Sequence, residues 1–190
     1  MKYSPVLLAI LLTTALQAGS LPLGYFQQEV KYDIDVKLDD KDHILRGHEK
    51  LLYMNNSPNS IDFIWMHLWP NAYKDNNTAF AKQMWENGRS KFYFSDEDDR
   101  GYIDSLNFTI KGVPLQVEAH PEWIDVVKLI LPAPLAPGKR ITIETPFKVK
   151  IPIVFSRLGH SGKHYEITQW YPKPAVYDMD GWHPMPYLNM

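Results

Sequence analysis

The residues best suited to contact a ligand lie near the C-terminal end of the sequence. Thr168-Gln169 is followed by a run dense in aromatic and proline residues, from Trp170 to Tyr177. A side-chain amide both donates and accepts hydrogen bonds. If residues 165–171 are extended, Gln169 and Tyr171 lie on one face, because alternate residues of a strand point the same way. This pattern predicts a wall of a substrate-binding groove formed by Gln169 and Tyr171, with the other wall in sequence outside this chain.

The histidines do not form a hydrolytic metal motif. His48-Glu49 begins the pattern H-E-x-x-H, in which two histidines one helical turn apart bind zinc, but Leu52 stands in place of the second histidine. His160 and His164 have the right spacing, but Ser161-Gly162-Lys163 between them favours a loop. A structural zinc site would need further ligands. We therefore predict no catalytic residue, no metal ligand and no cofactor in this chain.

The first 20 residues have the features of a signal peptide. Lys2 precedes an apolar run from Val6 to Leu12, and small residues follow up to Ser20. The run is well short of the ~20 apolar residues that a membrane-spanning helix needs. We expect export, to the periplasm or outside the cell, with no membrane span left after removal of residues 1–20. The sequence has no cysteine, so the exported domain must fold without disulfides.

Residues 21–190 are expected to form one domain. The sequence has 20 basic and 22 acidic residues, and the signal peptide holds one base and no acid, so the balance of the rest is 19 minus 22, or −3. No cluster of Lys and Arg is present, which argues against nucleic acid as a partner. The aromatic content of 13% argues against disorder.

Hydrophobic periodicity predicts an all-β fold. Residues 31–38 alternate strictly, with Tyr32, Ile34, Val36 and Leu38 on one face, and residues 61–69 are apolar on both faces, which is typical of a central strand. Further strands are predicted at 43–54, 102–111, 114–118, 123–131 and 139–150, a short helix at 79–87, an exposed loop at 87–100 and a proline-rich connector at 131–138. Many short strands with one helix favour an antiparallel β-sandwich.

Two C-terminal motifs carry a resemblance to a known family. They are Gln-Trp-Tyr-Pro-Lys-Pro-Ala-Val-Tyr-Asp at 169–178 and Gly-Trp-His-Pro-Met-Pro-Tyr at 181–187. With the signal peptide and the strand pattern, they resemble the N-terminal domain of the M1 (gluzincin) zinc aminopeptidases, in a bacterial exported branch, over about residues 25–188. The resemblance implies a saddle-shaped β-sandwich that positions peptide N-termini for a following or separate catalytic domain. That domain, absent from this chain, would hold the zinc.

The match departs from the family at two positions. Gln169 corresponds to a residue that lines the substrate cleft, but Tyr171 stands where most members carry Glu or Gln for the substrate amine, and Val176 where Arg is common. A carboxylate ~4 Å from an ammonium contributes on the order of 4 kcal/mol at an effective dielectric near 20, whereas an aromatic ring face contributes roughly 0.5–2 kcal/mol. Either a carboxylate of the missing domain holds the amine, or this branch selects less strictly for free N-termini.

A second interpretation is a free-standing, non-catalytic secreted module that binds peptide or carbohydrate through exposed Trp and Tyr. Gln169 could also only satisfy backbone groups at the edge of a sheet. The aromatic residues Tyr171, Tyr177, Trp182 and Tyr187 could pack against a following domain rather than touch substrate. Under either interpretation, the chain by itself is predicted not to hydrolyse peptides.

Overall fold

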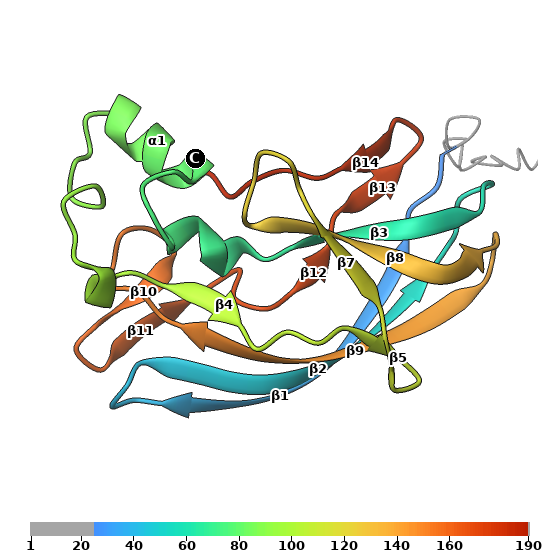
Figure 1. Ribbon diagram of the computed structural model, residues 1–190, viewed down its shortest axis with the longest axis horizontal. Helices are drawn as coiled ribbons and strands as arrows, with labels where there is room; N and C mark the ends of the chain where they lie inside the picture. Colours follow the sequence, from blue (N-terminus) through green and yellow to red (C-terminus); the bar gives the residue numbers. More distant parts are fainter. Residues whose placement is uncertain (1–24, 190) are drawn as a thin grey trace, which may run out of the picture.

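The structure is a computed structural model that describes residues 25–189 (Figure 1). These residues form antiparallel sheets with one short α-helix, so the predicted all-β, sandwich-like class is confirmed. The predicted signal peptide, residues 1–20, lies outside the described residues. No helix between residues 25 and 189 is both long and apolar enough to cross a membrane.

The larger sheet is built on three long strands. They are β1 (Glu29–Asp39), β2 (Ile44–Met54) and β9 (Arg140–Lys150), with β2 in the middle. Every residue of β2 has a partner on both sides, from Ile44 opposite Asp39 and Lys150 to Met54 opposite Glu29 and Arg140. Three shorter strands extend the sheet beyond β9: β4 (Tyr102–Asp104), β5 (Thr109–Ile110) and β6 (Val113–Pro114).

The smaller sheet has the strand order β12-β3-β8-β7. Its members are β12 (Lys173–Pro174), β3 (Ile61–His67), β8 (Val126–Leu135) and β7 (Gln116–Ala119). Two hairpins complete the strands: β10 (Leu158–Ser161) with β11 (His164–Ile167), and β13 (Val176–Asp178) with β14 (Gly181–His183). The helical elements are η1 (Trp69–Tyr73), α1 (Ala79–Glu86) and η2 (Glu97–Asp99).

The core lies between the two sheets. Alternate residues of β2 and β9 point inward, among them Leu51, Tyr53, Ile143 and Phe147, and they join Ile64, Met66 and Leu129 of the smaller sheet in one buried cluster. Burial of one such side chain stabilises the fold by about 1.5–3 kcal/mol. The helix α1 begins at Thr78, whose side chain accepts a hydrogen bond from the backbone N–H of Ala81, as an N-cap does.

Several element boundaries differ from the prediction. The proline-rich segment 131–138 is not a connector throughout, because β8 runs on to Leu135. Pro132 and Pro134 lie where the β3–β8 pairing is irregular, and β7 pairs no residue of β8 beyond Ile130. No backbone N–H is therefore needed for a sheet hydrogen bond at these two prolines. The predicted strand 102–111 is split into β4 and β5. Within the predicted exposed loop 87–100, Phe92 is fully buried against Phe80 and Phe155.

One charged residue of β2 points into the core. Glu49 is only 1% exposed, opposite Ile34 on β1 and Thr145 on β9, and its Oε2 has no hydrogen-bond partner within residues 25–189. Burial raises the pKa of Glu49 to about 8, because a carboxylate loses its hydration there. At neutral pH this group is held mainly in its protonated form.

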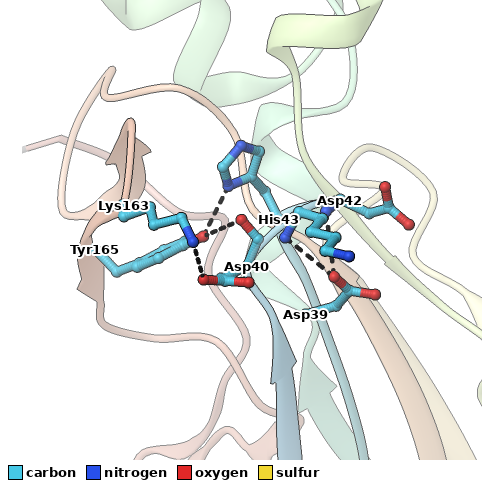
Figure 2. A network of polar contacts seen from close by, with 7 residues as sticks. Asp39, Asp40, Asp42, His43, Lys163 and Tyr165 are labelled. Carbon is cyan, nitrogen blue, oxygen red and sulfur yellow. Dashed lines mark hydrogen bonds and ion pairs between the residues drawn. The ribbon is translucent and has the colours of Figure 1, made fainter.

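The hairpin β10–β11 is fastened to the turn between β1 and β2, as Figure 2 shows in part. The imidazole rings of His43 and His160 stack with centroids 3.5 Å apart, and His43 Nδ1 lies 2.8 Å from the Tyr165 hydroxyl. Lys163 Nζ forms an ion pair with Asp40 at 2.6 Å. Since β11 leads directly to Thr168 and Gln169, these contacts help to position the residues of the candidate site.

We predict that Glu49→Gln stabilises the protein at neutral but not at acidic pH. With a folded pKa near 8 and an unfolded pKa near 4.5, the wild type loses stability as pH rises through this window, because only the unfolded chain releases the proton. The variant should gain on the order of 3 kcal/mol in the free energy of unfolding at pH 7 and little at pH 4, measured by urea denaturation. Glu144→Gln, on the outer face of β9, is the matched control; an equal gain at both pH values for Glu49→Gln would contradict the prediction.

We also predict that acidification loosens the β10–β11 hairpin. Burial, followed by the neighbouring His43, lowers the pKa of His160, so the folded state binds fewer protons than the unfolded one as pH falls below ~6.5, and stability is lost there. Amide hydrogen exchange at residues 159–165 should therefore reveal more frequent opening at pH 5 than at pH 7. His160→Phe keeps a stacking ring that does not titrate, and it should weaken this pH dependence. An unchanged dependence in the variant would show that His160 is not its source.

Candidate functional site

The chain leaves the β10–β11 hairpin through an unusual backbone conformation at Gln169. Strand β11 ends at Ile167, and Gln169 has φ of 57°, in the left-handed region that costs a residue with a side chain roughly 1–2 kcal/mol. The expectation that residues 165–171 form one extended strand is therefore wrong beyond Ile167. Strand alternation does not place Gln169 and Tyr171 on a common face.

The residues on both sides of Gln169 are anchored. The Thr168 hydroxyl donates to the Arg157 carbonyl at 2.7 Å. On the other side, the Trp170 ring packs against Phe147 of the core with centroids 5.8 Å apart. The side chain of Gln169 itself is half-buried and makes no hydrogen bond with any residue that the structure describes. A strained backbone held by its neighbours, with a free amide at its centre, is a common feature of ligand sites.

Tyr171 lies at the open edge of the sandwich. Its ring meets Tyr32 of the edge strand β1 edge-to-face, with centroids 5.2 Å apart, and it is half-buried. Burial, followed by the nearby Tyr171 and Glu49, raises the pKa of Tyr32. Glu166 is exposed opposite Gly159 in β10, and it alternates with the half-buried Tyr165 and Ile167. Neither Glu49 nor Glu166 contacts the Tyr171 hydroxyl through a hydrogen bond among the described residues.

The other C-terminal aromatic residues pack within this domain. Tyr187 is 3% exposed and contacts Trp69, Tyr73 and Phe80. Tyr177 and Trp182 stack on each other across the β13–β14 hairpin with centroids 4.8 Å apart. The expectation that Tyr187 packs against a following domain is therefore wrong, because its ring is already buried among aromatic residues of this domain.

Two cations on the segments that adjoin residues 168–169 were not identified from the sequence. Lys173 is paired with His67 across β12 and β3, and its Nζ lies 3.9 Å from the centroid of the Trp69 ring. The guanidinium of Arg157 lies 5.4 Å from the centroid of Tyr187. Because Trp69 and Tyr187 are themselves in edge-to-face contact at 5.9 Å, both cations lie over one continuous aromatic surface.

Burial lowers the pKa of the two basic groups at this aromatic surface. Burial, and then Arg157, lower the pKa of Lys173 to about 8. Burial, and then Lys173, lower the pKa of His67 to about 4. His67 is thus neutral at pH 7, and its Nε2 accepts a hydrogen bond from the Met185 N–H at 3.2 Å. These shifts have the sign expected where cations lose water without gaining an anion.

A separate groove opens between β1 and residues 174–178. It has a volume of about 300 Å³, and its lining includes Phe26, Tyr32, Tyr53 and Tyr177. The Tyr53 side chain is fully buried, and its hydroxyl has no hydrogen-bond partner in the described part of the chain. The buried Tyr53 hydroxyl is therefore closed to a ligand, and the groove offers mainly aromatic surface; no sequence pattern had indicated it.

The residues between 25 and 189 do not fit a hydrolytic zinc centre. His48 and Glu49 are consecutive in β2, so His48 is exposed while Glu49 is buried. His160 is committed to the stack with His43, and His164 lies across the hairpin turn. Within residues 25–189, no three His, Asp or Glu side chains are grouped to hold a metal ion, whereas a catalytic zinc needs three protein ligands.

Comparison with known proteins adds no family assignment to this geometry. No protein-family model matches the chain, and no curated protein sequence matches it significantly.

Proposed function

We propose that this chain is the substrate-positioning, N-terminal domain of an exported M1-family zinc aminopeptidase, with the zinc and its ligands on a catalytic domain outside this chain. The observation that carries the proposal is the state of Gln169. Its backbone is held in the left-handed region by anchored neighbours, and its amide is free of hydrogen bonds to described residues. The two C-terminal motifs and the antiparallel sandwich support the same assignment.

The role of Gln169 would be to pair with the backbone of a bound peptide. Its amide can donate to a peptide carbonyl and accept from a peptide N–H. Because the neighbouring residues fix the backbone, little conformational freedom is left to lose on binding, which favours affinity. Tyr171, packed on Tyr32, would supply an apolar wall rather than a charge.

The α-ammonium of the substrate would be held elsewhere. Glu49 is buried and mainly protonated at neutral pH, and Glu166 lies exposed on the opposite side of β11. Lys173 and Arg157, whose carbonyl bonds Thr168, would repel an ammonium that approached them. Of the two alternatives left open by the sequence, this arrangement favours a carboxylate on the catalytic domain.

A second candidate function is a free-standing binding module. The groove beside β1 favours it, since its lining includes the aromatic residues Phe26, Tyr32 and Tyr177, which can pack against a sugar ring or an aromatic side chain. The two functions predict different binding surfaces, because ligand would perturb Tyr53 and Tyr177 in one case and Gln169 in the other.

We predict that Gln169→Gly raises stability but weakens peptide binding. Glycine tolerates φ of 57° without steric cost, so the free energy of unfolding should rise by about 1 kcal/mol. The affinity for Ala-Ala-Ala, measured from NMR shift changes at residues 168–173, should fall at least fivefold. Gln116→Gly, an exposed glutamine of β7, is the control for losing an amide. Unchanged peptide binding by the Gln169 variant would leave Gln169 with a structural role only.

We further predict that the chain alone does not hydrolyse peptides. Its residues offer no three-ligand metal site in the described range, so adding Zn²⁺ should release no amino acid from aminoacyl reporter substrates. An authentic zinc aminopeptidase assayed in parallel establishes sensitivity. Turnover by the purified chain that a chelator abolishes, and that zinc restores, would contradict the prediction.

A further inference from the structure

Two positively charged side chains share one aromatic support at the end of the smaller sheet. Lys173 Nζ lies 3.9 Å from the Trp69 centroid, and the Arg157 guanidinium lies 5.4 Å from the Tyr187 centroid. The two rings meet edge-to-face at 5.9 Å. These contacts fix where both cations lie, because Tyr187 is buried and the Trp69 indole N–H donates to the Met185 carbonyl at 3.1 Å.

The two cations have no anionic partner in the described part of the chain. The ion pairs of residues 25–189 employ other bases, namely Lys50, Lys128, Lys148, Lys150, Lys163 and His183. Asp125, the carboxylate next to the Tyr187 backbone, already accepts the Tyr187 N–H at 2.7 Å, and burial raises its pKa to about 6. Like charges brought together without a counter-ion are unfavourable unless a bound anion offsets them.

Hydrogen-bond donors remain for such an anion. A guanidinium has five N–H donors, and Arg157 directs its Nε to the Tyr187 hydroxyl and its Nη2 to the Leu188 carbonyl. Its Nη1 has no partner among the described residues. The Lys173 ammonium engages a ring face rather than an acceptor atom. Gln169 lies between the two in the chain contacts, since Thr168 is bonded to the Arg157 carbonyl and Lys173 follows four residues after Gln169.

The donor set favours a carboxylate over a phosphate. Phosphate sites are commonly lined by successive backbone N–H groups, but Pro172 and Pro174 have none, and the Ala175 N–H is bonded to the Trp65 carbonyl. What remains is a planar guanidinium, one ammonium and one amide. A guanidinium pairs with carboxylates and phosphates alike, so it is the absence of backbone N–H donors that favours a carboxylate here.

We propose that Lys173 and Arg157 bind the carboxylate of a short peptide whose backbone Gln169 contacts. The inference rests on the proposed function, in which Gln169 contacts a peptide, and it specifies which end of the peptide faces these residues. The carboxylate comes either from the peptide C-terminus or from an acidic side chain. Its amine points away from the cations.

The experiment is an NMR titration of the full chain with three probes. They are N-acetyl-Ala-Ala as the free acid, N-acetyl-Ala-Ala amide, and N-acetyl-Asp-Ala amide. The free acid should bind at least fivefold more tightly than the amide, and saturation with it should raise the pKa of Lys173, followed through its side-chain Nζ or Cε signals. The acidic side-chain probe distinguishes the two sources, because it should match the acid only if an internal carboxylate can reach the cations.

Variants assign the effect to the two residues. Lys173→Met and Arg157→Met should each abolish the preference for acid over amide, Lys173→Arg should retain it, and Lys139→Met, at an exposed lysine of the turn before β9, should leave it unchanged. The Met185 and Tyr187 amide signals report whether the variants keep the local fold.

The outcomes separate this inference from the proposed function. Equal binding of acid and amide, with both weakened by Gln169→Gly, would overturn the carboxylate site and leave the proposed function standing. A preference for acid that needs Lys173 and Arg157 but survives Gln169→Gly would support the carboxylate site while removing Gln169 from peptide binding. A preference that persists in both methionine variants, or no binding of any probe, would overturn the carboxylate site.

Discussion

The packing of residues 168–189 against the smaller sheet is the constraint on which the candidate site depends. Figure 1 shows this segment returning along the sandwich and ending beside α1, where the Asn189 N–H donates to Gln83 at 2.7 Å. It is fixed at intervals: Lys173 and Pro174 pair with β3, His67 accepts the Met185 N–H, and the Tyr187 ring fills a buried space. Without these attachments, Lys173 would not lie beside Trp69, and nothing would hold the backbone of Gln169 in an unfavourable region.

The buried polar groups of the fold differ in whether they form hydrogen bonds to residues 168–189. His67 and Asp125 are 6% and 2% exposed, and each accepts a backbone N–H from residues 185–187. Their burial is therefore compensated by hydrogen bonds that position the C-terminal segment. Glu49 is equally buried but leaves Oε2 without a partner among the described residues, which costs stability at neutral pH. A residue such as Glu49, which lowers the free energy of unfolding and positions no other element, is expected where a requirement other than stability applies.

The strands were predictable because their pattern is local. Alternation in residues 31–38 and 139–150 identified β1 and β9. Glu49 lies on the same face of β2 as Leu51 and Tyr53, an inward position that was not predicted from the sequence. The continuation of β8 through Pro132 and Pro134 was not predictable, because it depends on where β7 ends. The left-handed Gln169 has no signature, since glutamine is not a typical residue for positive φ. The approach of Arg157 to Lys173 could not be predicted either, because Arg157 precedes β10 and Lys173 begins β12, and only the fold brings these strands together.

The sign of the charge near Gln169 constrains how a peptide could lie there. Family resemblance alone suggested that this residue stands near the substrate amine, with Tyr171 replacing the usual acidic or amide group. The structure instead places Arg157 and a partly desolvated Lys173 over the rings of Tyr187 and Trp69, and no carboxylate is hydrogen-bonded to either among the described residues. Both cations would repel an ammonium that approached them, although water screens the exposed Arg157, and a Tyr171 ring face would offer that ammonium only roughly 0.5–2 kcal/mol. The surface of this domain is therefore better suited to the carbonyl and carboxylate groups of a peptide than to its amine, and an enzyme built on it would have to recognise the free N-terminus from the catalytic domain.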